Sequence, residues 1–331
     1  MKTILRLVAL LLLLALPTVA QAQMYTNSDG VWSYIFNADG ITLNITGYTG
    51  SSASVTIPTN IDGLTVTSIA DATFGNCASL TNVMIGADVT NMGVNVFYNC
   101  PNLDAITVDS NNPAYSSLAG VVFNQNQTML IAYPEGKPGN YVIPNTVTNI
   151  GVNAFASCLN LDHVTIPDSV LTIGGGAFRY CLSLTSITIP GSVTNLGFIA
   201  FANCFNLTAI YFQGNAPTPT NDSSVFSDGS DGTVYYLPGA TGWGPTFDNR
   251  PAVLWNPLPQ TSDADFGVRS NRFGFNITGG SNLVIVVEAC TNLANPAWTP
   301  ISTNTLVNGA SYFSDPAWMN YPGRFYQLTM P

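Results

Sequence analysis

One arrangement of hydrophobic and polar residues recurs five times between Val66 and Phe212. Each copy reads Val-x-x-Ile, then a Phe, then Cys-x-x-Leu, and finally Ile-x-Ile or a close equivalent. The alternation in Ile-x-Ile predicts a short strand with one buried face. Pro167 and Pro190 then end the strand, because proline cannot donate to a β-ladder. Each copy is therefore expected to form a strand on one side and a turn around the Phe on the other.

The copies follow one another at a fixed period. Their cysteines lie 23, 58, 23 and 23 residues apart, and they are Cys77, Cys100, Cys158, Cys181 and Cys204. A period of this length indicates a solenoid, in which coils stack because one coil cannot bury its apolar side alone. The strands should then form a parallel sheet. The Phe residues should form an internal column, which comprises Phe74, Phe97, Phe155, Phe178 and Phe201.

The full pattern is Val-Thr-x-Ile-Gly-x-x-Ala-Phe-x-x-Cys-x-x-Leu-x-x-Ile-x-Ile-Pro, which residues 147–190 follow closely. It resembles the BspA-like, cysteine-containing class of bacterial leucine-rich repeats over residues 41–215. The resemblance implies a β-rich solenoid of leucine-rich repeat coils. It also implies a surface or secreted protein that attaches to host matrix proteins or to other cells.

The chain divides into four parts. Residues 1–22 read as a signal peptide, with Lys2 and Arg6 before an apolar run and cleavage expected near Ala22. Residues 23–256 are the predicted solenoid with terminal caps, and 109–141 is an insertion that contains a hairpin around 124–127. After a Pro-rich linker, strand-like runs in 257–331 predict a small antiparallel, sandwich-like β module.

Six cysteines in an exported chain would ordinarily suggest disulfides. Five of them occupy one repeat position, which places them in a column of small buried side chains rather than in facing pairs. We therefore expect free thiols, each able to donate to a carbonyl in the turn. Cys290 lies outside the repeats and is expected in a buried strand.

Charge excludes one class of partner. Without Lys2 and Arg6, six basic residues remain against 18 acidic ones, so a basic nucleic-acid surface is absent. No segment after the leader has the roughly 18 apolar residues needed to span a bilayer. A secreted or cell-surface location is expected.

Catalytic motifs are missing from the sequence. His163 is the only histidine, and it occupies an outward strand position that predicts a solvated side chain. No nucleophile, phosphate-binding or zinc motif is present, so we expect neither an enzyme nor a cofactor. Asp228 and Asp231 in a Gly-rich loop leave calcium as a minor alternative.

The outward side of the predicted strands is the main candidate for a binding face. It comprises Asn82, Met84, Ala105, Thr107, His163, Thr165, Ser186, Thr188, Ala209 and Tyr211. Solenoids bind partners on such surfaces, although a plain solvated sheet is the simpler reading here. The insertion is a second candidate, since binding residues often gather on loops.

Three functions follow from these features. The first is a non-enzymatic protein that presents an adhesion-type surface to an extracellular protein or cell-surface ligand. The second is a structural or envelope spacer without a specific ligand. The third is a carbohydrate-binding accessory protein that stacks aromatic side chains of the last module on sugar rings, although a core position is the more ordinary role for these aromatics. They are Trp298, Tyr312, Trp318 and Tyr321.

Overall fold

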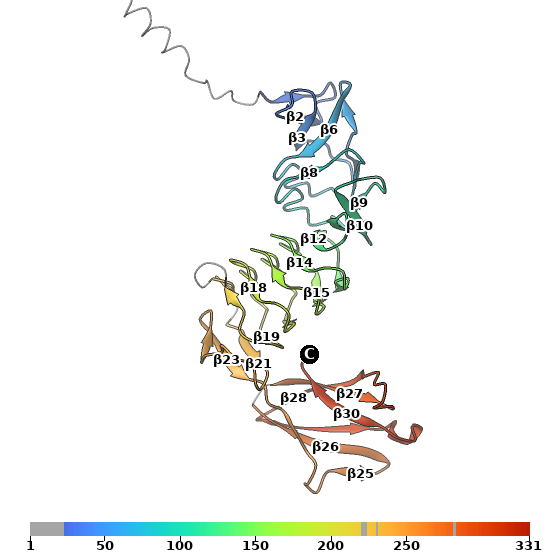
Figure 1. Cartoon of the computed structure of the whole chain (residues 1–331), viewed down its shortest axis with the longest axis vertical. Coiled ribbons are helices and arrows are strands. Elements are labelled where there is room, and N and C mark those ends of the chain that lie inside the picture. Colours follow the sequence, from blue (N-terminus) through green and yellow to red (C-terminus); the bar gives the residue numbers. More distant parts are fainter. Residues whose placement is uncertain (1–22, 220–223, 230, 281–282) are drawn as a thin grey trace, which may run out of the picture.

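The computed structural model describes residues 23–331 except 220–223, 230 and 281–282. The predicted signal peptide lies outside the described residues. Figure 1 shows stacked coils that run from the N-terminal strands to two antiparallel sheets at the other end of the molecule. The predicted fold class, a solenoid of about 23 residues per coil followed by a β module, is confirmed.

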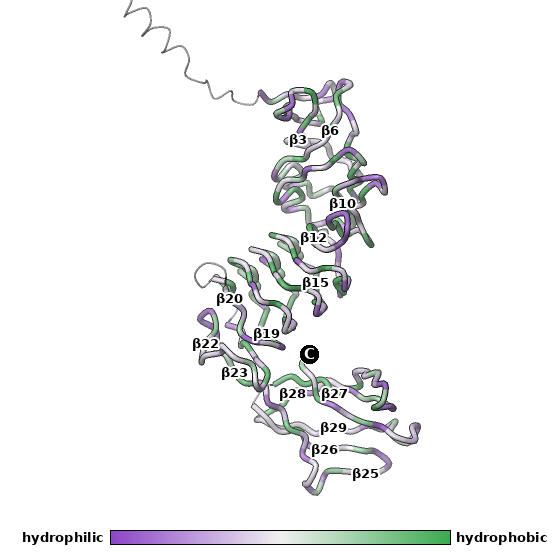
Figure 2. Tube along the Cα trace, viewed as in Figure 1, coloured by the Kyte–Doolittle hydropathy of each residue, from purple (hydrophilic) through white to green (hydrophobic). Residues whose placement is uncertain are grey.

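The Ile-x-Ile segments form the predicted parallel strands. Their register confirms the repeat: Ser186 pairs with Ala209 and Ile189 with Phe212, 23 residues further on. Figure 2 shows hydrophobic and hydrophilic segments alternating along the coils. The strands of this ladder are β4 (Ser54–Thr56), β7 (Asn82–Ile85), β9 (Ala105–Val108), β13 (Gly139–Val142), β15 (Leu161–Thr165), β17 (Ser186–Ile189), β19 (Ala209–Phe212), β21 (Thr233–Tyr236) and β23 (Arg250–Leu254).

A second parallel ladder precedes the Phe column, where the sequence predicted no strand. Each coil contributes only a short pairing there, such as Ile150 with Ile173. Most of these strands are too short to show a period, which is why the pattern did not predict them. They are β6 (Leu64–Ile69), β8 (Asn91–Met92), β12 (Met129–Ala132), β14 (Asn149–Ile150), β16 (Thr172–Ile173), β18 (Asn195–Leu196) and β20 (Thr218–Pro219).

The turns around the Phe residues are themselves joined by backbone hydrogen bonds. In the coil of Phe178, the N–H groups of Gly176, Phe178 and Tyr180 donate to carbonyls of the next coil at 2.9, 2.8 and 3.0 Å. Gly176 and Tyr180 both have positive φ, and this backbone shape recurs at the same two positions of each regular coil. The left-handed residues bend the chain sharply, so the Phe ring enters the core.

Aromatic rings and thiols form the two internal columns. Phe155, Phe178 and Phe201 stack at centroid distances of 4.9 and 5.2 Å, and all three are buried. The thiol of Cys204 donates to the carbonyl oxygen of Phe178 at 3.0 Å, one coil back. Cys100 and Cys181 make the same contact to Phe74 and Phe155. All six cysteines are free thiols.

The insertion rejoins the coils through its hairpin. The strands β11 (Val121–Asn124) and β12 pair antiparallel, as the sequence predicted, and β12 then pairs in parallel with β14. An additional strand, β10 (Tyr115–Leu118), pairs with β11. The apolar side chains of β11 fall into two hydrophobic clusters: Val122 packs with the coils before the insertion, and Phe123 with those after it.

Both ends of the solenoid are closed by irregular strands. At the start, β1 (Tyr25–Thr26), β2 (Trp32–Phe36) and β3 (Leu43–Tyr48) form an antiparallel cap that joins the first coil through β6, beside the short β5 (Asn60–Ile61). At the other end the repeat motif fades after Phe212, but β21 and β23 continue the parallel ladder. Phe226 extends the ring column beyond Phe201 at 5.7 Å, so the core persists after the motif is lost. The short β22 (Thr246–Phe247) pairs with β23.

The last residues form two facing antiparallel sheets with apolar side chains between them. Phe275, Ile277, Ile285 and Phe313 are buried there, and Cys290 is a buried strand residue as expected. One sheet contains β24 (Leu258–Gln260), β25 (Gly267–Arg269), β26 (Arg272–Thr278) and β29 (Ala310–Asp315); the other contains β27 (Val284–Cys290), β28 (Thr299–Thr305) and β30 (Phe325–Thr329), with the 3-10 turn η1 (Trp318–Asn320) before β30.

Candidate functional site

The predicted binding residues lie in two columns across the parallel strands, which we call the strand face. Asn82 is in register with Ala105, and Met84 with Thr107. Further along, His163 and Thr165 are in register with Asn140 and Val142 of β13, and the next two strands carry Ser186 beside Ala209. The sheet geometry therefore places side chains from distant parts of the sequence on one surface.

The insertion interrupts the strand face between β9 and β13. The backbone N–H of Ile106 donates to the carbonyl oxygen of Gly120 at 2.9 Å, which brings the hairpin against β9. Gly120 has φ +81°, and a Cβ atom there would lie 2.9 Å from that of Ala105. Only glycine fits this approach without displacement. The face is thus divided into a part on β7 and β9 and a part on β13 to β17.

The C-terminal module covers the last rungs of the strand face, so the prediction that Tyr211 is exposed is wrong. Tyr211 is only 1% exposed, and its ring stacks on Tyr235 at 5.1 Å inside a cluster that includes Leu283 and Phe275 of the module. The hydroxyl of Thr188 donates to the carbonyl oxygen of Pro331. Trp255 Nε1 donates to the carbonyl oxygen of Val284 at 3.2 Å. These contacts fix the module against β17, β19 and β21.

The uncovered part of the strand face is small and mainly uncharged. Asn82, Met84, Thr107 and Thr165 are exposed, whereas His163 and Ser186 are half-buried. Asn82 Nδ2 donates to Thr81 Oγ1 at 3.0 Å. Hydroxyl, amide and thioether groups can form hydrogen bonds and apolar contacts with a partner, but they offer no nucleophile paired with a base.

A buried carboxylate in the insertion was not assigned a role from the sequence. Glu135 accepts hydrogen bonds from the backbone N–H groups of Asn99 at 3.0 Å and Cys100 at 2.7 Å. Burial raises the pKa of Glu135 to about 7, against the opposing effect of these two donors. Its side chain thus replaces a carbonyl that the next coil would supply in the regular repeat. Glu135 is one of only two glutamates in the chain, which is the only signal the sequence offered.

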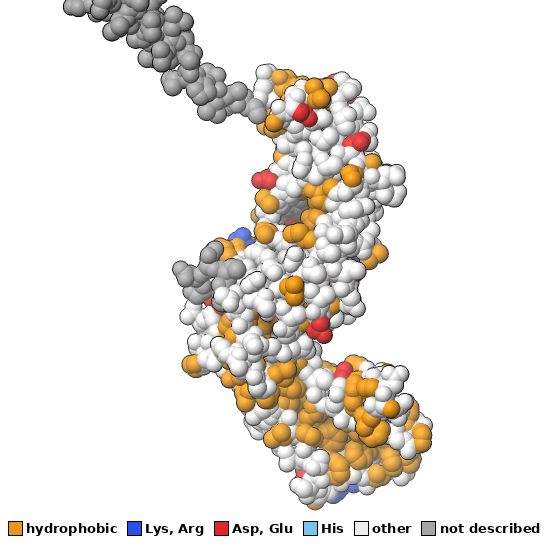
Figure 3. All heavy atoms as spheres, viewed as in Figure 1, with side chains coloured by type: hydrophobic (Ala, Val, Ile, Leu, Met, Phe, Trp, Pro, Cys, Tyr) orange, Lys and Arg blue, Asp and Glu red, His pale blue; other side chains and the backbone are white. Residues whose placement is uncertain are grey.

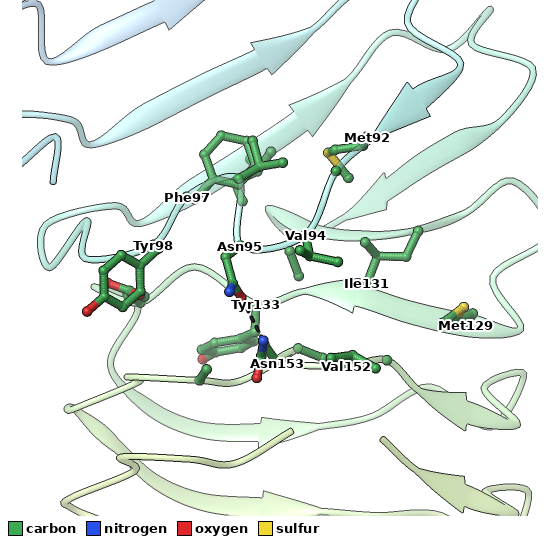
Figure 4. Close-up of a pocket in the computed structure, with 18 of the residues that line it drawn as sticks. Met92, Val94, Asn95, Phe97, Tyr98, Met129, Ile131, Tyr133, Val152 and Asn153 are labelled. Carbon is green, nitrogen blue, oxygen red and sulfur yellow. Dashed lines mark hydrogen bonds between the residues drawn. The ribbon is translucent and has the colours of Figure 1, made fainter. Parts of the chain in front are cut away.

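A cavity of about 500 Å³ lies beside Glu135, between the coil of Phe97 and the coil of Phe155. Figure 4 shows Val94, Asn95 and Phe97 on one wall and Tyr133, Val152 and Asn153 on the other. Asn153 Nδ2 donates to Asn95 Oδ1 at 2.7 Å and joins the walls at one point. The remaining lining is largely apolar and includes Met92, Met129 and Ile131.

The aromatic side chains of the last module do not occupy the core positions that the sequence favoured. Tyr312 and Tyr321 are exposed, and Trp318 is half-buried with its Nε1 donating to the carbonyl oxygen of Asn271 at 3.2 Å. The ring of Tyr312 lies across Gly274, whose missing Cβ leaves room for it. The guanidinium of Arg324 lies 4.3 Å from the centre of the Tyr321 ring. Each of these three aromatic side chains therefore has its own local partner.

The described residues offer no cluster of three His, Cys, Asp or Glu side chains of the kind that holds a metal. In the loop considered for calcium, the Asp231 carboxylate pairs with Arg250 at 3.1 Å. A guanidinium at this distance disfavours a cation on the same carboxylate. In the part of the chain that the structure describes, no helix has the length and apolar composition that a bilayer crossing requires.

The comparisons with known proteins agree with the repeat. The model of the BspA type leucine rich repeat region matches six copies over residues 47–130 and 132–234, which is more than half of the chain. The chain therefore belongs to the BspA-type leucine-rich repeat family, whose proteins are bacterial surface or secreted proteins. No curated protein matches the chain.

Solved structures of bacterial leucine-rich repeat proteins also resemble it. One from Eubacterium ventriosum is 22% identical, with a TM-score of 0.40 over 71% of this chain and 85% of that one. A leucine rich cell surface protein from Faecalibacterium prausnitzii is 21% identical, with a TM-score of 0.34 over 65% and 94%. A protein from Bacteroides ovatus is 21% identical, with a TM-score of 0.34 over 68% and 75%.

Proposed function

We propose that this chain is an exported, non-enzymatic repeat protein whose solenoid binds an extracellular protein or a cell-surface ligand through the strand face. The observation that carries this proposal is the unequal cover of that face. The module buries the last rungs around Tyr211, whereas Asn82, Thr107 and Thr165 stay open to solvent. Membership of a family of surface and secreted repeat proteins supports the same function.

The chemistry of the open face suggests the kind of contact. Its exposed groups are hydroxyls, one amide and the thioether of Met84, with no charged side chain among them. Such a surface suits a neutral or weakly charged partner that it contacts by short-range hydrogen bonds rather than by long-range attraction. Affinity from these contacts should be modest and only weakly dependent on salt, because no strong charge pairs are involved.

The test uses the chain without residues 1–22, immobilised and exposed to a panel of matrix proteins, polysaccharides and bacterial cells. Saturable binding that Thr107→Arg and Thr165→Arg each weaken by tenfold or more would support the proposal. Leu171→Arg is the control, because Leu171 is exposed outside the strand face. Binding that survives both changes but is lost in Trp298→Ala or Trp318→Ala would favour a carbohydrate-binding module. Binding to no member of the panel would favour a spacer.

A further inference from the structure

The regular turns of the solenoid are joined by a fixed set of hydrogen bonds. In the coil of Phe155, the N–H groups of Asn153, Phe155 and Ser157 donate to the carbonyls of Gly175, Ala177 and Arg179 at 3.0, 2.7 and 2.7 Å. The coils of Phe74 and Phe178 make the equivalent three bonds to their next coils. One edge of every such turn therefore presents donors, and the other edge presents acceptors.

The coil of Phe97 breaks this rule on its donor edge. Its N–H of Asn99 is satisfied by the carboxylate of Glu135. Among the described residues, however, the N–H groups of Asn95 and Phe97 have no acceptor. These two residues are two positions apart, which is the spacing at which an extended segment presents donors along one edge.

The facing wall shows the complementary gap. The N–H of Tyr133 donates to the carbonyl oxygen of Ala154 at 2.7 Å, so part of the acceptor edge is used. The carbonyl oxygen of Val152 occupies the position that accepts from the preceding coil elsewhere, and no described group donates to it. Unpaired backbone groups are costly unless water or another chain pairs them.

The column of aromatic rings is interrupted at the same place. Phe74 stacks on Phe97 at 5.4 Å, and Tyr133 packs on Phe155 at 5.0 Å. Between these two pairs lies the cavity of about 500 Å³, which is within the range of ligand pockets. Figure 4 shows Phe97 and Tyr133 on its opposite walls. The space therefore lacks both one backbone rung and one apolar side chain.

The cavity is open to a partner. Val94 and Val152 at its rim are 55% and 58% exposed, and Tyr98 and Met129 are exposed beside them. Figure 3 shows the surface hollowed here, with hydrophobic side chains around the opening. Glu135 is the only charged residue in the lining, and its carboxylate already accepts two backbone hydrogen bonds.

We infer that this gap binds an extended peptide segment of another protein, which supplies the missing rung and the missing side chain. Carbonyls of the peptide accept from the N–H groups of Asn95 and Phe97, and one of its N–H groups donates to the carbonyl oxygen of Val152. An aromatic or large aliphatic side chain fills the cavity between Phe97 and Tyr133. Backbone pairing provides affinity and the pocket provides selectivity, as in other cases of strand addition. The site is separate from the strand face.

The experiment selects displayed nine-residue peptides on the chain without residues 1–22, with counter-selection on Val152→Lys. Phe198→Lys is the matched control, because Phe198 has the same repeat position as Val152 and is 52% exposed, but lies outside the cavity. We expect peptides with a central aromatic or aliphatic residue that bind wild type and Phe198→Lys equally and Val152→Lys at least tenfold more weakly. Amide exchange at Asn95 and Phe97 should slow when they bind.

Three results would overturn the inference. The first is a selection that yields no peptide able to distinguish wild type from Val152→Lys. The second is binding without slower exchange at Asn95 and Phe97, or unaffected by methylation of the peptide backbone nitrogens, since the cavity would then take only an apolar group. The third is concentration-dependent self-association of wild type that Val152→Lys abolishes, which would make a second copy the occupant. Thr165→Arg should leave peptide binding unchanged, so this test is independent of the strand face.

Discussion

The Sγ atom of Cys181 lies 3.1 Å from the carbonyl oxygen of Phe155, which holds the aromatic position one coil earlier. The contact links the thiol column to the ring column across two coils. Burial raises the pKa of the Cys181 thiol well above its ordinary value, so the thiol keeps its proton and acts as a donor. The repeated cysteine is thus a hydrogen-bonding core residue.

Replacing Cys181 with alanine should lower the free energy of unfolding by about 1–3 kcal/mol, because the buried carbonyl of Phe155 loses its thiol donor. The measurement is chemical denaturation of the chain without residues 1–22. Cys77→Ala is the control, since Cys77 is only half-buried at the start of the column and should cost less. Equal losses in both variants would show that the contact contributes nothing beyond the volume of the side chain.

Phe155→Ala should be more damaging, at about 3–5 kcal/mol, because it removes a fully buried ring. That ring packs between Tyr133 at 5.0 Å and Phe178 at 4.9 Å, so its loss also loosens both neighbouring coils. Phe205→Ala is the matched control, because Phe205 is exposed. Denaturation should show almost no change for the control. A similar loss in both variants would contradict the role of the column.

The limits of the sequence are seen in Phe155 and Tyr211. Phe155 was assigned to the core correctly, because five copies of the motif repeat the same position. Tyr211 was assigned to the surface by the same logic, since it is equivalent to Met84 and Thr107. What buries Tyr211 is a module that begins more than 40 residues later, and a local period contains no information about such packing.

The cavity at Phe97 was beyond reach for a related reason. It lies where the period fails, after the 58-residue interval between Cys100 and Cys158. The length of the insertion does not reveal whether its residues refill the coil. That outcome depends on the irregular pairing of β11 with β12, which leaves Tyr133 on the ring column and directs Glu135 to the backbone of the previous coil.

Glu135 should make stability depend on pH. Its folded pKa of about 7 is above the ordinary value of 4.5, so between these values the folded state holds a proton that the unfolded chain releases. The contribution is therefore complete below about pH 4.5 and is lost as the pH rises through about 7. Denaturation of wild type and Glu135→Gln from pH 4 to 8 should show this fall only in wild type. Parallel pH profiles would refute the assignment.

Ile199 has φ +51°, a left-handed conformation that is unfavourable for a β-branched residue. Asn95 and Asn153 occupy the same repeat position with φ +55°, and asparagine tolerates this region better. Ile199→Asn should therefore raise the free energy of unfolding by up to about 1 kcal/mol, since relieved strain exceeds the loss of a half-buried side chain. The reciprocal change Asn153→Ile should lower it. A loss of stability in Ile199→Asn would show that packing outweighs strain.

The contact between Tyr211 and the module should make the two parts of the chain unfold together. Tyr211→Ser removes a buried ring from an interface that also contains Tyr235 and Trp255, so we expect a loss of about 3–5 kcal/mol. Calorimetry should show one transition for wild type and two for the variant, because the module no longer stabilises the last coils. The emission of Trp255 should follow the transition of the interface.

The matched control for this change is Tyr312→Ser, which removes an exposed tyrosine from the outer surface of the module. It should leave a single transition, because the interface stays intact. Two transitions in wild type would instead mean that Tyr211, Thr188 and Trp255 hold the parts in place without coupling their stability. In that case the module could leave the strand face, and the covered rungs at β17 and β19 would become available to a partner together with the open ones.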